Sequence, residues 1–156
     1  MKFSAFVVTE AITTDLEADT ARAAVDEMIQ ALIRAKALPK DHRRKIVDAV
    51  MRREKKGTTG FGNGVAIPHA KHDGVPRIVG TVAVCKDGID FAALDRAPVH
   101  LMFLLLSNTE APELHLKAME HVFRSIKNDN LRRFMMRAST PGELADLLRE
   151  ADEELG

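Results

Sequence analysis

Residues 99–106 read Val99-His100-Leu101-Met102-Phe103-Leu104-Leu105-Leu106, the longest apolar stretch of this 156-residue chain. A nearly continuous apolar run of this length is typical of a strand buried on both faces, because both alternating sets of side chains are apolar. Such a strand needs helices on both sides of its sheet. The stretch is far too short to cross a bilayer, so we expect no membrane insertion.

Two helices are predicted before this strand. The first is capped by Asp19 or Thr20 and stops before Pro39. The second begins at residue 40 or 41 and stops at Gly57. Residues 58–64 then read as a Gly-rich loop, and residues 65–67 as a short strand that Pro68 truncates.

Further strands and helices complete the pattern. Residues 77–85 are rich in Val and predict a strand, with a turn at residues 86–88. A third helix begins near Pro112, and a fourth helical piece covers residues 131–135. Thr140 and Glu143 form a capping box for the last helix. The expected inward-facing stripe of the third helix is Leu116, Met119, Phe123 and Ile126. This order predicts a single α/β domain over residues 1–156.

Composition excludes several classes of protein. Lys plus Arg equals Asp plus Glu, 23 of each, which argues against a nucleic-acid binder that works through bulk positive charge. The single Cys85 allows neither an internal disulfide nor a thiolate metal site, and it suits a reducing compartment. No signal-peptide core is visible at the N-terminus. We therefore expect a cytoplasmic protein.

His69 is the leading candidate for chemistry. It follows Pro68 at the end of a short strand, where a side chain can be both exposed and rigidly held. The preceding Gly60, Gly62 and Gly64 would let backbone amides approach an anion. A neutral imidazole is a competent nucleophile toward phosphorus. A His that merely ends a strand is the competing interpretation.

Two further residues could assist His69. His115 lies in the first turn of the third helix, where the helix dipole disfavours a protonated imidazole and attracts an anion. Arg53 lies just before the Gly-rich loop and could bind phosphate oxygens. Taken alone, His115 is better explained by a half-buried packing role, and Arg53 by a solvated helix end where a cation favours the dipole.

The remaining histidines have weaker signals. His69, His72 and Asp73 could imitate a metal cluster, but no HExxH or CxxC pattern accompanies them. We assign His100 to the core or a sheet face, and His42 and His121 to helix surfaces.

Taken together, these residues resemble a known family. The prefix Arg53-Glu54 and the segment Thr58-Thr-Gly-Phe-Gly-Asn-Gly-Val-Ala-Ile-Pro-His-Ala-Lys71 are similar to the signature of fructose/mannitol-type Enzyme IIA domains of the bacterial phosphotransferase system. Gly88 to Phe91, the strand from Pro98 to Leu106, and Glu113 to Leu116 continue the likeness, which is strongest over residues 16–148. The nitrogen-regulatory branch looks most similar, although Phe61 and Ala70 depart from its usual residues.

The resemblance implies a fold and a set of roles. The fold is a mixed β-sheet flanked by helices on both faces. His69 accepts a phosphoryl group from the phosphocarrier HPr as a tele-phosphohistidine, with His115 assisting and Arg53 stabilising charge. No metal or other cofactor is implied.

We therefore expect a phosphotransfer protein. Because no membrane domain or Cys-bearing acceptor domain is attached, a regulatory, nitrogen-type role is favoured, with regulatory target proteins as partners. A sugar-transport IIA component that passes its phosphoryl group to a separate IIB domain stays open. An unphosphorylated interaction module and a His-based metal hydrolase are two further hypotheses.

Overall fold

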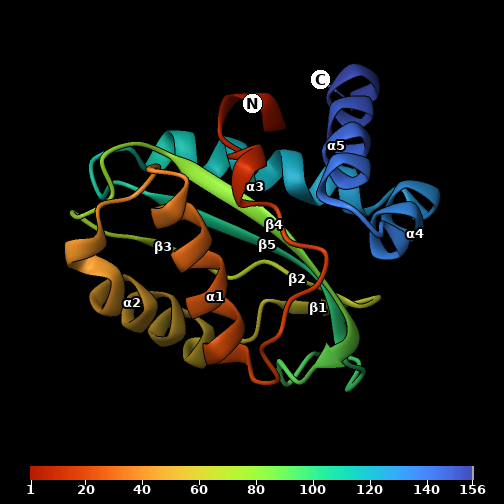
Figure 1. Ribbon diagram of the computed structural model, residues 1–156, viewed down its shortest axis with the longest axis horizontal. Coiled ribbons are helices and arrows are strands. Elements are labelled where there is room, and N and C mark those ends of the chain that lie inside the picture. The colour runs from red at the N-terminus through yellow and green to blue at the C-terminus, as the bar shows by residue number, and fades with distance from the viewer. Residues whose placement is uncertain (156) are drawn as a thin grey trace.

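A computed structural model describes residues 1–155 of the chain, and β5 (Val99–Ser107) is the central strand of its mixed sheet (Figure 1). Leu101, Phe103 and Leu105 enter the apolar cluster on one face of the sheet, whereas Met102, Leu104 and Leu106 enter the cluster on the other. The buried strand expected from the apolar run is confirmed. Helices α1 (Ala21–Arg34) and α3 (Pro112–Ile126) lie on opposite sides of the sheet in Figure 1, as an α/β fold requires.

One edge of β5 holds β2 (Val65–Ala66) and β3 (His69–Lys71), both parallel to it. Val65 pairs with Leu101 and His69 with Leu105, so the two strands keep the same register across Ile67 and Pro68. Pro68 cannot donate a hydrogen bond, but its carbonyl oxygen accepts one from the Leu105 N–H at 3.1 Å. β2 ends before Pro68, as the sequence predicts, but pairing with β5 resumes at once in β3, so His69 lies in the sheet.

The loop predicted before β2 contains a strand, so this prediction is wrong in part. β1 (Gly60–Gly62) pairs antiparallel with β2. Asn63 and Gly64 both have positive φ, 59° and 78°, as in the tight two-residue turns that match the twist of a hairpin. The Asn-Gly pair is the local signal for this hairpin.

The other edge of β5 holds β4 (Val79–Ile89), which is antiparallel to it. The turn expected at residues 86–88 is wrong, because the strand continues through them with an irregular register between Val84 and Ile89. Gly88, at φ 82°, accommodates the irregularity. The outer edge of β4 is covered by the N-terminal segment, in which Val7 and Thr13 form parallel bridges to Gly80 and Ala83.

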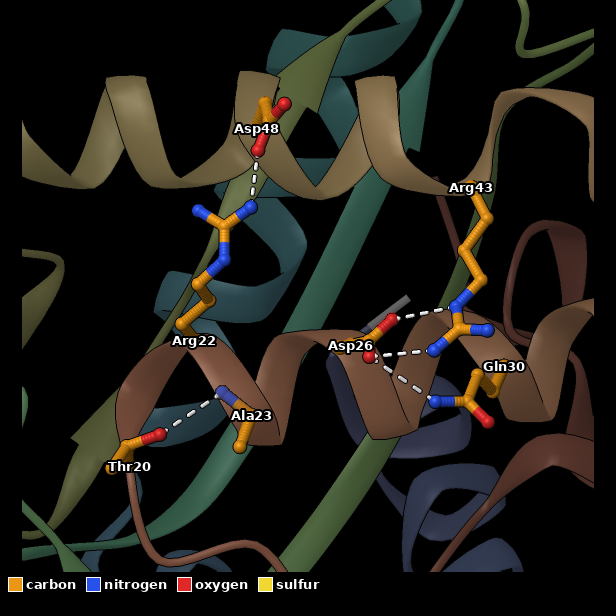
Figure 2. Close-up of polar contacts among 7 residues, drawn as sticks. All are labelled: Thr20, Arg22, Ala23, Asp26, Gln30, Arg43 and Asp48. Atoms are coloured by element: carbon orange, nitrogen blue, oxygen red, sulfur yellow. Dashed lines mark hydrogen bonds and ion pairs between the residues drawn. The ribbon is translucent and has the colours of Figure 1, made fainter.

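Helices α1 (Ala21–Arg34) and α2 (Arg43–Lys56) pack on the Met102 face. The Thr20 hydroxyl accepts a hydrogen bond from the Ala23 N–H at 3.1 Å and caps α1. Figure 2 shows two links between the helices: Arg22 to Asp48, and Arg43 to Asp26 with a 2.7 Å contact. Because the Arg43 guanidinium is so near, the pKa of Asp26 is lowered. These partly exposed pairs orient two helices that apolar packing already holds.

Helices α3 (Pro112–Ile126), α4 (Asp129–Arg137) and α5 (Pro141–Leu155) lie with the other apolar cluster. The inward stripe expected for α3 is correct only in part: Met119, Phe123 and Ile126 are half-buried against the apolar cluster, but Leu116 is not. His115, Ala118, His121, Val122 and Ser125 are buried, whereas Leu116 is 60% exposed. The predicted cap of α5 is present, since the Thr140 hydroxyl accepts a hydrogen bond from the Glu143 N–H, but the Glu143 carboxylate binds Ser139.

A buried carboxylate connects the chain ends, and it corrects the surface placement of His121. The Asp152 carboxylate of α5 accepts hydrogen bonds from the N–H groups of Phe3 and Ser4, at 2.6 and 3.0 Å. His121 is fully buried, with Nε2 2.8 Å from the same carboxylate. Burial lowers the pKa of His121, although Asp152 opposes that shift. His42 is likewise half-buried rather than exposed.

Within residues 1–155, no helix combines the length and apolar character needed to cross a bilayer.

Replacing Asp152 with Ala should destabilise the fold by about 2–4 kcal/mol, because two buried donors and the partly buried Ser4 N–H lose their acceptor. Urea unfolding measures the change. Asp146→Ala on the same helix is the control. Asp146 forms only an exposed pair with Arg149, so this change should cost less than about 0.5 kcal/mol. Equal losses for the two variants would contradict the assigned role of Asp152.

Candidate functional site

His69 is half-buried in β3, and its ring is oriented by the backbone. Nδ1 lies 2.8 Å from the carbonyl oxygen of Ile67. A carbonyl can only accept a hydrogen bond, so Nδ1 carries the ring proton. Nε2 therefore keeps its lone pair, and no group among the described residues forms a hydrogen bond with it. The imidazole is held as a nucleophile that reacts through Nε2.

Glu54 and Thr59 connect α2 to the strand that leads to His69. The Glu54 carboxylate accepts hydrogen bonds from the backbone N–H and the hydroxyl of Thr59, at 2.7 and 2.6 Å. The fully buried Thr59 hydroxyl in turn accepts one from the Ile67 N–H at 3.2 Å. Ile67 is the residue whose carbonyl binds His69. Glu54 and Thr59 belong to the family-like segment, but the sequence predicted no role for either residue. No local pattern indicates this chain of hydrogen bonds.

His115 is the second histidine of the site. It lies in the first turn of α3, is 6% exposed, and its ring centroid is 5.4 Å from that of His69. Burial, followed by the nearby His69 and Lys71, lowers the pKa of His115 to about 4. His115 is therefore neutral near pH 7. Burial also lowers the pKa of His69, with Arg53 contributing and the Ile67 bond opposing.

Both histidines open onto one cleft of about 410 Å³. Its lining residues come from α2, β3 and α3, and they are Ala49, Arg52, Arg53, Lys56, His69, Ala70, Lys71 and His115. The structure thus brings together the three residues expected from sequence: His69, His115 and Arg53. The charged groups of the lining are all cationic, which suits an anionic group such as a phosphoryl.

Arg53 has a defined place in this wall. Its guanidinium donates a 2.8 Å hydrogen bond to the Gly57 carbonyl oxygen, so it folds back over the end of α2. Arg52, Lys56 and Lys71 were missed as site residues. The run of charges at residues 52–56 was the available signal, but such runs are usually only solvated surface.

The Gly-rich segment has a different role from the one expected. Gly60, Gly62 and Gly64 do not line the cleft. A Cβ on Gly60 would lie 2.8 Å from that of Ala93, and one on Gly64 would lie 2.2 Å from the Met136 methyl. These glycines permit close packing and the hairpin turn, so the expectation that they approach an anion beside His69 is wrong.

The remaining histidines lie outside the cleft. His72 Nδ1 accepts a hydrogen bond from the Gly74 N–H at 2.9 Å, and His100 Nδ1 lies 2.9 Å from the Cys85 carbonyl oxygen. Among residues 1–155, no three His, Cys, Asp or Glu side chains converge as a metal site requires. The geometry thus gives no support to the metal hydrolase hypothesis.

Acid should destabilise the fold through His115. An unfolded His titrates near 6.5, whereas the pKa of His115 in the fold is about 4. Between these values the unfolded chain binds a proton that the folded chain does not, so the free energy of unfolding falls as the pH falls. Urea unfolding from pH 7 to 4.5 should show a smaller loss for His115→Asn than for the parent protein. Equal slopes would contradict the low pKa.

Comparisons with known proteins identify the family of the chain. The family model for "Phosphoenolpyruvate-dependent sugar phosphotransferase system, EIIA 2" matches residues 5–151. A nitrogen regulatory protein of Bradyrhizobium diazoefficiens is 34% identical over 131 residues, which cover 84% of each chain. A fructose-specific EIIABC component of Bacillus subtilis is 28% identical over 98% of this chain, which spans only 24% of that protein's length.

A solved structure has the same fold. The nitrogen regulatory protein IIA-Ntr of Neisseria meningitidis superposes with a TM-score of 0.83 at 28% identity, covering 94% of this chain and 98% of its own. The chain belongs to the EIIA type 2 family of the phosphoenolpyruvate-dependent sugar phosphotransferase system.

Proposed function

We propose that this protein accepts a phosphoryl group from an HPr-type phosphocarrier on Nε2 of His69 and acts as a regulatory, nitrogen-type IIA. The supporting observation is the pair of neutral histidines in one cationic cleft, with the Nδ1 of His69 bound to the Ile67 carbonyl oxygen. This arrangement leaves a nucleophilic lone pair facing a space that suits an anion.

The transfer step follows from these groups. The lone pair of Nε2 forms a bond to phosphorus while the bond between phosphorus and the donor breaks, and that electron pair leaves with the donor. Positive charge develops on the His69 ring, and the Nδ1–H bond to the Ile67 carbonyl stabilises it. Arg53, Arg52, Lys56 and Lys71 offset the charge of the phosphoryl oxygens.

A regulatory role is favoured by the similarity to nitrogen regulatory proteins along most of their length. In such a role, the charge added at the cleft changes which partner is bound. A sugar-transport role is supported by the fructose-specific relative. Incubating the phosphorylated protein with a separate fructose-type IIB domain distinguishes the two roles: rapid transfer of the label to IIB would overturn the regulatory assignment.

Phosphorylation of His69 is directly testable. With labelled phosphoenolpyruvate and the general phosphotransferase proteins, the wild type should gain acid-labile label, and phosphorus NMR should identify Nε2-phosphohistidine. His69→Ala should gain none. His72→Ala is the matched control, since this nearby histidine does not line the cleft, and it should be labelled normally. An unlabelled wild type would support an unphosphorylated interaction module instead.

His115→Ala should slow labelling by roughly tenfold or more while preserving the fold, because one hydrogen-bond partner of the transferred group is lost. Labelling reactions quenched at successive times measure the rate, and circular dichroism checks the fold. An unchanged rate would return His115 to a packing role.

A further inference from the structure

Ser107 has a buried hydroxyl beside the proposed phosphoryl site. The transfer step described above gives this hydroxyl no role. Ser107 is the last residue of β5, follows a strand that is apolar apart from His100, and is fully buried. Its Oγ lies 2.5 Å from Nδ1 of His115, which is also buried. A buried hydroxyl is costly unless it forms a hydrogen bond, and here that bond is made with the assisting histidine.

The backbone holds this hydroxyl in place. Ser107 pairs with Lys71 of β3, and its carbonyl oxygen accepts a hydrogen bond from the His72 N–H at 2.9 Å. The strand paired with Ser107 is β3, which contains His69. The Ser107 hydroxyl is therefore positioned by the same strand pairing that positions the proposed phosphoacceptor.

The hydrogen-bond partners of the two Nδ1 atoms differ in whether they can donate a proton. His69 Nδ1 contacts a carbonyl oxygen, which can only accept, so its proton must be on Nδ1. His115 Nδ1 contacts a hydroxyl, which can donate. If Ser107 donates to Nδ1, the ring proton of neutral His115 is on Nε2.

The cleft decides between the two tautomers of His115. Its remaining ring nitrogen, Nε2, is the one available to the cleft that His115 lines together with His69. An Nε2–H donates to an oxygen of a phosphoryl group on His69, whereas an Nε2 lone pair would repel it. His115 is too weakly basic to supply a second proton near pH 7, so its donor must come from the tautomer.

We propose that Ser107 is a positioning residue whose hydroxyl donates to Nδ1 of His115 and holds it as the Nε2–H tautomer, aimed at the phosphoryl oxygens. This inference rests on the proposed transfer to His69. The two histidines then have opposite tautomers and complementary roles: the carbonyl of Ile67 makes His69 the nucleophile, and the hydroxyl of Ser107 makes His115 the hydrogen-bond donor.

Nitrogen NMR of the unphosphorylated, ¹⁵N-histidine-labelled protein tests the tautomer without any transfer. In the wild type, long-range proton–nitrogen spectra should show protonated Nε2 in His115 and protonated Nδ1 in His69. Ser107→Ala should give His115 a mixture of tautomers and leave His69 unchanged. A His115 protonated on Nδ1 in the wild type, or an unaltered spectrum in Ser107→Ala, would overturn the proposal.

Labelling rates test whether Ser107 acts through His115. Ser107→Ala should slow phosphoryl transfer roughly fivefold to tenfold in the parent protein, but less than about twofold in a His115→Ala background. Ser125→Ala is the control, since this equally buried serine of α3 donates to the His121 carbonyl oxygen, and it should keep the parent rate. Equal losses in both backgrounds would overturn the coupling.

The two proposals fail in distinguishable ways. A wild type that gains no label, but has His115 protonated on Nε2 in a Ser107-dependent manner, would reject the transfer function and keep the tautomer assignment. A wild type that is labelled normally, but has His115 protonated on Nδ1, would reject only the role of Ser107.

Discussion

The parallel pairing of β3 with β5 is the constraint on which the site depends. It sets His69 opposite Leu105 and Lys71 opposite Ser107, so one ladder places the β3 residues of the cleft and the hydroxyl beside His115. β5 in turn is held by apolar side chains on both faces, which makes a slip in register costly. A reactive side chain on such a strand loses little entropy when it reacts, because the sheet has already oriented it.

Two neighbouring imidazoles can share the cleft because both are neutral in the resting state. Burial lowers the pKa of each ring, and the surrounding cations act in the same direction. The positive charge of the site therefore resides on Arg and Lys side chains rather than on the histidines. That division leaves one imidazole free to attack phosphorus and the other free to donate a hydrogen bond.

The side of the sheet away from α1 and α2 has a separate polar centre. Asp152, His121 and the first residues of the chain bond together among apolar side chains, and the bonds tie α5 and α3 to the N-terminal segment. The His121 Nδ1 atom has no hydrogen-bond partner within the described part of the chain. The free-energy cost of burying this unpaired nitrogen is offset by the three hydrogen bonds that the Asp152 carboxylate accepts.

The sequence by itself determined the buried central strand, the helices on either side of it, and His69 with its Arg53-Glu54 prefix. These features are local, since they follow from apolar runs, caps and a contiguous motif. Only the tertiary structure decided that the strand resumes after Pro68, that α3 buries His121 rather than Leu116, and that Ser107 meets His115. Each depends on the strand register and helix rotation that optimise packing across the whole core, and no short stretch of residues encodes those on its own.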